Sequence, residues 1–145
     1  MTFETIRYEV DDNGIAVLTL NRPEKLNSFT QVMFDEWREV IAGVAFSDDV
    51  RFLIITGTGR AFSSGADLGF LGSEKKSSAF RFYYRQAHQS FEDLDALEVP
   101  VIAAINGICY GGGVDHLVFK SPDQVLLNHH AATRNVDQGC RILHR

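Results

Sequence analysis

Hydrophobic positions along the chain switch between strand-like and helix-like spacing. Two β-rich runs, at residues 5–10 and 15–20, flank the turn-forming residues Asp-Asp-Asn-Gly at 11–14, and together they predict a β-hairpin. After a loop at 21–27, apolar residues recur on one face of a helix that starts at Thr30. That face consists of Met33, Phe34, Trp37, Val40, Ile41 and Val44. The first third of the chain is therefore predicted to be a hairpin followed by an amphipathic helix.

The middle of the chain repeats the alternation of strand and helix. Two apolar runs, at 51–56 and 100–105, have the length and composition of buried strands. Between them the sequence predicts a small-residue loop at 61–68 that enters a short helix, and then a longer helix over 77–96. The apolar face of the longer helix is predicted to hold Phe80, Tyr84, Ala87, Phe91 and Leu94. Buried strands separated by amphipathic helices predict an α/β layer fold.

Glycine-rich backbone follows each of the two apolar strands. Ligands gather at the carboxyl ends of strands in open α/β sheets, and glycine lets the backbone approach a ligand closely. Two such loops could each offer one N–H group to a single carbonyl oxygen, which is an oxyanion hole. Each donor contributes on the order of 3 kcal/mol to a transition state that bears an enolate or alkoxide. The alternative is that the glycines only turn the chain, and it is the stronger explanation for either loop taken alone.

Four motifs, taken together, resemble those of the crotonase superfamily, which is the enoyl-CoA hydratase/isomerase family. They are Asn-Arg-Pro-Glu-Lys-Leu-Asn at 21–27, Ala-Phe-Ser-Ser-Gly-Ala-Asp-Leu at 61–68, Val-Pro-Val-Ile-Ala-Ala-Ile-Asn-Gly at 99–107, and Gly-Gly-Gly at 111–113. The resemblance covers residues 3–115, with the motifs in family order and at family spacing. It implies an α/β fold of the crotonase-like ββα spiral type, of which this chain holds the N-terminal part, with an atypical C-terminal tail.

The resemblance also implies a set of site residues. The two backbone donors of the oxyanion hole fall at Ala66 and Gly112, and the first catalytic carboxylate falls at Asp115. The residues implied to line the site for the adenine and pantetheine of coenzyme A are Lys25, Leu26, Ala66, Asp67, Leu68, Gly69 and Gly112. The substrate is implied to be an acyl-CoA thioester, so coenzyme A arrives as part of the substrate and no cofactor is bound permanently. The family's usual assembly is a homotrimer or a dimer of trimers, whose assembly helices normally lie beyond the end of this chain.

The carboxylate at Asp115 departs from the glutamate of typical hydratases and resembles the aspartate of dienoyl-CoA isomerases and some other branches. A thioester carbonyl held by two N–H groups becomes an electron sink, so its α-carbon can carry enolate character. A nearby carboxylate can then move a proton, which is typically worth 10²- to 10⁴-fold in rate. Aspartate is one methylene shorter than glutamate, so the subclass stays open between hydratase, isomerase and other crotonase types.

Composition divides the chain at Asp115 and His116. Residues 1–115 carry 10 basic and 17 acidic side chains, a net charge of −7, whereas residues 116–145 carry a net charge of +2 and four of the five histidines. The sequence predicts two segments, an acyl-CoA-binding core at 1–115 and a divergent tail at 116–145 that lacks the apolar strand expected next. The family's second acid would fall at Asn135. The tail is interpreted as a truncation with foreign or frame-shifted sequence, or as a divergent native ending.

Two functional hypotheses follow. One is an acyl-CoA enzyme of the hydratase/isomerase type, and the other is a catalytically inactive fragment with at most weak affinity for CoA thioesters. Because the second acid is missing, we expect negligible hydration of crotonyl-CoA by the unmodified chain. Of the aromatic residues Phe80, Phe82, Tyr83 and Tyr84, one or two are expected to border the acyl pocket and the rest to pack in the core or at its rim.

Charge, hydropathy and histidine spacing exclude other classes. A net charge of −5 argues against a nucleic-acid partner, whose phosphates favour a basic surface. The longest apolar stretch, 99–114, is broken by Pro100, Asn106 and four glycines, so no membrane span is predicted. The N-terminal residues lack the pattern of a signal peptide, and a cytoplasmic location is expected. The spacing of His129, His130, Cys140 and His144 matches no four-ligand zinc pattern, so no metal site is predicted.

Overall fold

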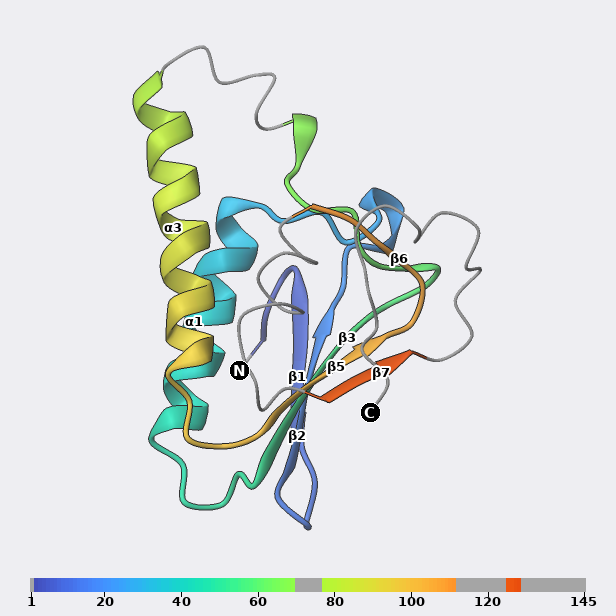
Figure 1. Ribbon diagram of the computed structural model, residues 1–145, viewed down its shortest axis with the longest axis vertical. Coiled ribbons are helices and arrows are strands. Elements are labelled where there is room, and N and C mark those ends of the chain that lie inside the picture. Colours follow the sequence, from blue (N-terminus) through green and yellow to red (C-terminus); the bar gives the residue numbers. More distant parts are fainter. Residues whose placement is uncertain (1, 70–76, 112–124, 129–145) are drawn as a thin grey trace.

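A five-stranded sheet with two helices on one side forms the body of the protein. The computed structural model describes residues 2–69, 77–111 and 125–128. The strands lie in the order β1-β2-β3-β5-β7, with bounds Ile6–Val10, Ile15–Leu20, Phe52–Gly57, Val101–Ile105 and Val125–Asn128. Helices α1 (Gln31–Ala45) and α3 (Ser77–Asp95) lie side by side against one face of this sheet (Figure 1). The expected α/β layer fold is confirmed.

The predicted hairpin is present, and its short turn explains why its strands are antiparallel. β1 pairs with β2 from Ile6 opposite Leu20 to Val10 opposite Ala16. The Asp11 carboxylate closes the turn by accepting hydrogen bonds from the backbone N–H groups of Asn13 (2.9 Å) and Ile15 (2.8 Å). These bonds lower the pKa of the Asp11 carboxyl group. All further pairs in this sheet are parallel. Helix α1 crosses between β2 and β3, and helix α3 crosses between β3 and β5.

Helix α1 follows its predicted pattern closely. The Thr30 hydroxyl caps the helix by accepting a hydrogen bond from the Met33 N–H at 3.2 Å. The buried residues of the helix are the six that the helical spacing predicts: Met33, Phe34, Trp37, Val40, Ile41 and Val44. They pack against alternate residues of the strands, such as Leu18 in β2 and Ile55 in β3, both of which are fully buried. This layer between sheet and helices is the hydrophobic core.

The predicted stripe of helix α3 needs correction. Tyr84, which the spacing places on the apolar face, is half exposed, and Phe80 is 44% exposed. Tyr83 is buried instead, along with Ser90, Phe91 and Leu94. The predicted set and the observed set both have helical spacing. The spacing alone therefore could not decide which of the adjacent residues Tyr83 and Tyr84 is buried. Tyr83 takes the buried position because its hydroxyl donates a hydrogen bond to the Phe29 carbonyl at 2.8 Å.

Three short strands were not predicted. Residues 61–63, expected as the start of a loop, form strand β4 (Ala61–Ser63), and residues 108–109 form β6 (Ile108–Cys109). Beyond Asp115 the sequence predicts no apolar strand, and this prediction is wrong, because β7 extends the main sheet. It pairs in parallel with β5, from Val125 opposite Ile102 to Asn128 opposite Ile105. The interpretation of residues 116–145 as foreign sequence is not tested by this pairing and stays a prediction.

Candidate functional site

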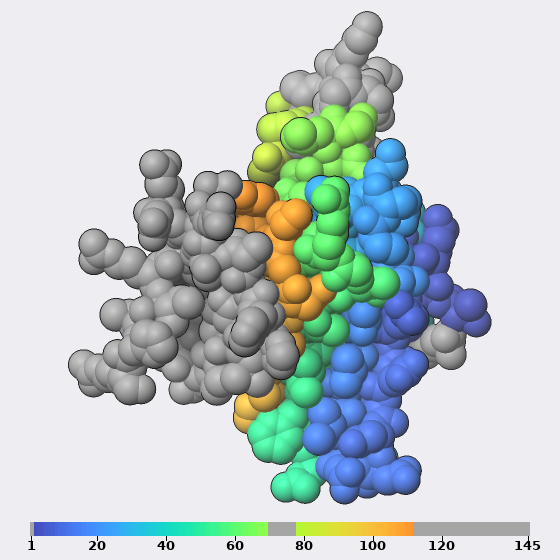
Figure 2. All heavy atoms as spheres, turned by 90° about the vertical axis from the view of Figure 1, so that its right-hand side faces the viewer, coloured from blue at the N-terminus to red at the C-terminus, as the bar shows by residue number. Residues whose placement is uncertain are grey.

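Loops from three parallel strands meet at one edge of the sheet. β2, β3 and β5 run in the same direction, so the segments that follow them, at 21–30, 58–67 and 106–111, gather at their carboxyl ends. We call this cluster of three segments the loop edge. The small β4–β6 sheet joins the second segment to the third, and the Tyr110 N–H donates to the Ser63 carbonyl at 2.9 Å. In Figure 2 the orange atoms of the third segment lie directly against the green atoms of the second.

Asn27 ties the first segment to the second. Its side-chain amide is fully buried and donates to the carbonyl groups of Thr58 (3.0 Å) and Ala61 (2.8 Å), while its Oδ1 accepts from the Arg22 N–H at 2.8 Å. Its backbone carbonyl accepts a hydrogen bond from the Ser63 hydroxyl at 2.9 Å. The backbone of Asn27 is left-handed, with φ of 52°, which asparagine tolerates better than most residues. The site therefore depends on a buried polar residue whose role the sequence did not reveal.

The backbone N–H of Ala66 is available to a ligand because of a single parallel β-bridge to Phe29. In that bridge the Phe29 N–H donates to the Gly65 carbonyl at 2.8 Å, and the Phe29 carbonyl accepts from the Asp67 N–H at 3.0 Å. Because the bonds run through the residues on either side of Ala66, its own N–H points away from Phe29. It donates no hydrogen bond within the described part of the chain. An unbonded N–H is one requirement of an oxyanion-hole donor, and that role for Ala66 stays a prediction.

The third segment approaches Ala66 closely through glycines. Gly65 has φ of +86°, and a Cβ atom added to it would lie 2.9 Å from the Tyr110 carbonyl oxygen and 3.4 Å from the Gly111 Cα. Only glycine allows both this backbone conformation and this contact. The second and third segments are therefore in contact as far as Gly111. Gly112 and Asp115 lie outside the described residues, so the second donor and the carboxylate stay predictions.

Asp67 holds the loop edge together rather than presenting a free carboxylate. Its Oδ2 lies 3.1 Å from the Arg22 guanidinium and accepts a hydrogen bond from the Ser28 hydroxyl at 3.0 Å. The same guanidinium donates to the Ser28 carbonyl at 2.8 Å. Both charged side chains are mostly buried, at 19% and 16% exposure. The pair thus fixes the residue that follows Ala66.

The other residues implied to contact coenzyme A lie on the surface around this edge. Lys25 ends the short 3₁₀ helix η1 (Pro23–Lys25) and is exposed, and Leu26 follows it in a left-handed conformation with φ of 51°. The Leu26 carbonyl accepts the Ser64 N–H at 2.9 Å, which sets the η1 turn beside the Ala66 segment. Leu68 is 78% exposed, and Gly69 is also exposed. Their accessibility suits the ligand-contacting role that the resemblance implies, and this role stays a prediction.

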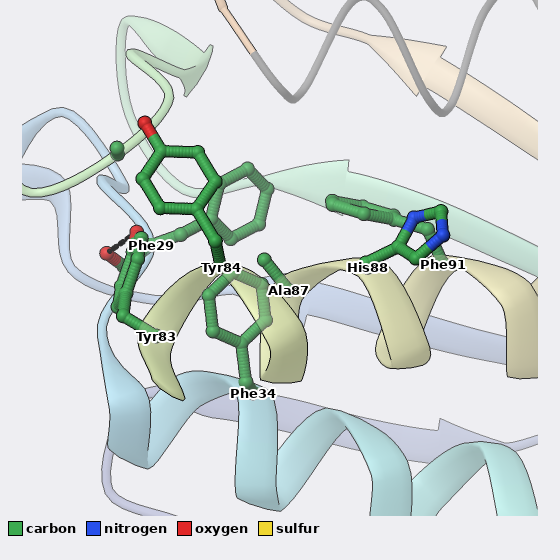
Figure 3. A pocket seen from close by; sticks show the side chains of 8 residues that line it. Phe29, Phe34, Tyr83, Tyr84, Ala87, His88 and Phe91 are labelled. Carbon is green, nitrogen blue, oxygen red and sulfur yellow. Dashed lines mark hydrogen bonds between the residues drawn. The ribbon is translucent and has the colours of Figure 1, made fainter. Parts of the chain in front are cut away.

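An apolar pocket of about 370 Å³ opens beside Ala66. Five aromatic residues form what we call the aromatic wall: Phe29, Phe34, Tyr83, Tyr84 and Phe91. Ala66, Ala87 and His88 complete the lining. Figure 3 shows Phe34 projecting from α1, while Tyr83, Tyr84, His88 and Phe91 come from α3. The His88 imidazole also lies 3.1 Å from the Glu92 carboxylate, one turn further along the helix.

Tyr83 connects the aromatic wall to the Ala66 bridge. Its hydroxyl donates to the Phe29 carbonyl at 2.8 Å, the same oxygen that accepts the Asp67 N–H (Figure 3). Burial raises the pKa of Tyr83 to about 12, and the nearby Asp67 charge acts in the same direction. The phenol therefore stays protonated at neutral pH and acts as a fixed donor. The Tyr83 hydroxyl thus holds the Phe29 carbonyl, which in turn accepts the N–H of the residue that follows Ala66.

Sequence reasoning found part of this pocket. Of Phe80, Phe82, Tyr83 and Tyr84, one or two were expected to border an acyl pocket, and the two that line this one are Tyr83 and Tyr84. That an acyl group occupies this pocket stays a prediction. His88 and Phe29 were not proposed as pocket residues. The signal for the α3 contribution was present, because Tyr83, Tyr84, Ala87, His88 and Phe91 fall on neighbouring helical positions. Phe29 carried no such signal, since its position follows from the bridge to Ala66.

The described residues hold no group of three or more histidine, cysteine or acidic side chains arranged for a metal ion. The residues at His129, His130, Cys140 and His144 lie outside the described part of the chain. No helix among the described residues is both long and apolar enough to cross a membrane.

Solved structures of similar architecture place the fold in the crotonase class. An enoyl-CoA hydratase from Bacillus anthracis matches with a TM-score of 0.74 and 29% identity, over 77% of this chain and 43% of that one. An enoyl-CoA hydratase/isomerase from Xanthobacter autotrophicus Py2 matches with a TM-score of 0.72 and 32% identity, over 77% of this chain and 42% of that one. The crotonase-like fold, in its N-terminal part, is thus confirmed.

The chain belongs to the enoyl-CoA hydratase/isomerase family, whose sequence model matches residues 11–132. The match continues beyond Asp115, where the resemblance was expected to stop. Among curated relatives, the fatty acid oxidation complex subunit alpha of Shewanella baltica is 36% identical over 106 residues, which is 72% of this chain. This chain spans 15% of the length of that relative.

Proposed function

We propose that the protein binds an enoyl-CoA thioester and stabilises its enolate, as a member of the hydratase/isomerase type. The observation that carries this proposal is the Ala66 N–H, which the bridge to Phe29 leaves available beside an apolar pocket. The thioester oxygen accepts this N–H and that of Gly112, and the acyl group enters the aromatic pocket. Coenzyme A extends over Lys25, Leu26, Leu68 and Gly69.

The proposed chemistry is removal or delivery of a proton at the acyl α-carbon. Two N–H donors stabilise the negative charge that develops on the thioester oxygen, so the α-proton becomes more acidic. Asp115 takes or returns that proton through its short side chain. The loop edge contributes by holding its donor rigid: Asn27 and the Asp67–Arg22 pair fix the segments on both sides of Ala66. A preorganised donor needs no rearrangement as the charge develops.

Removal of the Ala66 N–H tests the proposal. Ala66→Pro deletes this donor but leaves the Gly65 carbonyl and the Asp67 N–H, which make the bridge to Phe29. Ala66→Ser is the matched control, because it changes the side chain and keeps the N–H. We expect α-proton exchange of butanoyl-CoA in D₂O, followed by NMR, to slow about 100-fold in the proline variant. The serine variant should exchange at a rate close to that of the unmodified chain.

Circular dichroism and the urea midpoint must show that both variants are folded. Because proline also restricts the backbone, an ester replacing the Gly65–Ala66 amide provides a second way to delete the same N–H. Equal loss in the serine variant, or unchanged exchange in the ester variant, contradicts a backbone role for Ala66. Thioester binding by the unmodified chain with no exchange at all supports the alternative, an inactive fragment that only binds.

A further inference from the structure

The three segments of the loop edge converge on one carbonyl group, that of Ala61. Ala61 belongs to the second segment, where it is the first residue of β4. The side-chain amide of Asn27, in the first segment, donates to its oxygen at 2.8 Å. The side-chain amide of Asn106, in the third segment, donates to the same oxygen at 3.4 Å. A single oxygen atom therefore links all three segments.

Asn106 also ties the end of β5 to the end of β3. It follows the last residue of β5, and its Oδ1 accepts the Gly57 N–H at 3.1 Å, while its Nδ2 donates to the Gly59 carbonyl at 2.9 Å. The fit around Gly57 is tight, because a Cβ atom added there would lie 2.4 Å from the Ala61 carbonyl oxygen. The side chain of Asn106 thus uses its acceptor and its donor to hold the start of the third segment.

From Asn106 onward the third segment runs beside the second. The Ile108 N–H donates to the Arg60 carbonyl at 3.2 Å, and the Tyr110 N–H donates to the Ser63 carbonyl at 2.9 Å. Alternate residues of the third segment, at 106, 108 and 110, therefore bond to the second segment or to its neighbour at the end of β3. Because the bonds of paired strands repeat every two residues, the contact at Asn106 sets the register of those that follow.

We propose that Asn106 is a positioning residue of the oxyanion hole. Its side-chain amide sets the distance between the Ala66 N–H and the second donor, which the resemblance implies at Gly112. This inference rests on the proposed function and adds to it a residue that acts through the backbone of the third segment. Ala66 belongs to the second segment and Gly112 follows the third, so a slip between these segments changes the distance between the donors. Misplacement by about 1 Å can cost about 100-fold in rate.

Asn106→Asp tests the inference in the whole chain. It keeps the size of the side chain and the acceptor for the Gly57 N–H, but it places a carboxylate oxygen against the carbonyl groups of Gly59 and Ala61. Val44→Ala is the matched control for lost stability. Val44 is buried in the core one residue before the end of α1, so its truncation leaves a cavity without changing the hydrogen bonds of Asn106.

Two ligands separate the oxyanion hole from the rest of the site. Butanoyl-CoA carries the thioester carbonyl, and S-butyl-CoA has a CH₂ group in its place. Isothermal titration should show that the unmodified chain prefers butanoyl-CoA, and infrared difference spectra should show the carbonyl band of the bound thioester at lower frequency. In Asn106→Asp we expect S-butyl-CoA to bind within about twofold of normal. The preference for butanoyl-CoA should fall roughly 3- to 10-fold, and α-proton exchange should slow roughly 10- to 100-fold.

Val44→Ala should leave the preference, the carbonyl band and the exchange rate unchanged. An Asn106→Asp variant that is folded by circular dichroism and keeps all three overturns the inference, and so does an equal loss in Val44→Ala. Either result leaves the proposed function intact. If Asn106→Asp does not fold, Asn106→Ala, which introduces no charge, decides the question by the same measurements. If the unmodified chain shows neither a preference for butanoyl-CoA nor a shifted carbonyl band, the proposed function fails as well.

Discussion

The loop edge and the aromatic wall meet at Phe29, yet different forces hold them. The loop edge is built from buried hydrogen bonds that each require one donor and one acceptor, as at Asn27, Ser63 and Asp67. The wall is built from ring contacts between Phe34, Tyr83 and Phe91, which depend on shape and area. Hydrogen bonds are directional, whereas apolar packing tolerates substitutions of similar volume.

This difference separates two tasks within one site. The position of a backbone donor must be fixed within a few tenths of an ångström, and directional bonds on both sides of Ala66 do this. The wall has a different origin, because three of its five rings come from α3 and one from α1, and only Phe29 comes from the loop edge. Substitutions in the loop edge should therefore damage both stability and chemistry. In the wall, substitutions at the four buried rings should cost stability, whereas a substitution at the half-exposed Tyr84 should leave the fold largely unchanged.

The largest effect is expected at Asn27. Asn27→Ala removes three side-chain hydrogen bonds and leaves the Ala61 carbonyl in a buried place with a single long contact of 3.4 Å to Asn106. The free energy of unfolding in urea should fall by about 3 kcal/mol, at roughly 1 kcal/mol for each lost bond. Asn27→Gly is the matched control, since it loses the same bonds but relieves the left-handed backbone. A loss below 1 kcal/mol in both variants would contradict the central role of Asn27.

A smaller effect is expected at Tyr83, where the two regions join. Tyr83→Phe deletes the bond to the Phe29 carbonyl and should cost about 1 kcal/mol at pH 7. The pKa of Tyr83 is about 12 in the folded protein, whereas the ordinary pKa of a tyrosine is 10.0. Its contribution to stability is therefore complete below pH 10 and is lost as the pH rises from 10 toward 12, where the unfolded chain ionises first. Urea titrations at pH 8 and pH 11 should show a steeper decline for the unmodified chain than for Tyr83→Phe, and parallel declines would refute this assignment.

The smallest effect is expected from the ion pair that supports Ala66. Asp67→Asn keeps the shape of the side chain but removes the charge opposite Arg22, and should destabilise the fold by roughly 0.5–1 kcal/mol. Asp93→Asn is the control, because the Asp93–Arg38 pair is more exposed, at 36% and 39%. In 1 M NaCl the exposed pair should lose its contribution, while the Asp67 pair should keep part of its own. If 1 M NaCl instead removes the contribution of the Asp67 pair and leaves that of the Asp93 pair, the Asp67–Arg22 pair is no better shielded from salt than a surface pair.

Much of the main architecture could be predicted from the sequence because local pattern determines it. The hairpin follows from two β-rich runs around a turn, and the buried face of α1 follows from the spacing of its six apolar residues. The resemblance of the motif at 61–68 implied a backbone donor at Ala66. The structure leaves the Ala66 N–H unbonded among the described residues, and its role as a donor stays a prediction. The choice between Tyr83 and Tyr84 could not be made in this way, since both have helical spacing.

The features that only the tertiary structure decided depend on residues far apart in the chain. β4 and β6 are too short to show a periodic pattern, and each exists because it pairs with the other. β7 likewise forms by pairing with β5, across a segment in which the composition changes. The availability of the Ala66 N–H is set by Phe29, 37 positions earlier, because the bonds of a parallel bridge pass through the neighbours of Ala66. The sequence by itself determined the hairpin, the buried strands β3 and β5, and the two helices, since these depend on spacing within one element. The folded chain decided which backbone groups stay unbonded, because a hydrogen bond needs its partner in place.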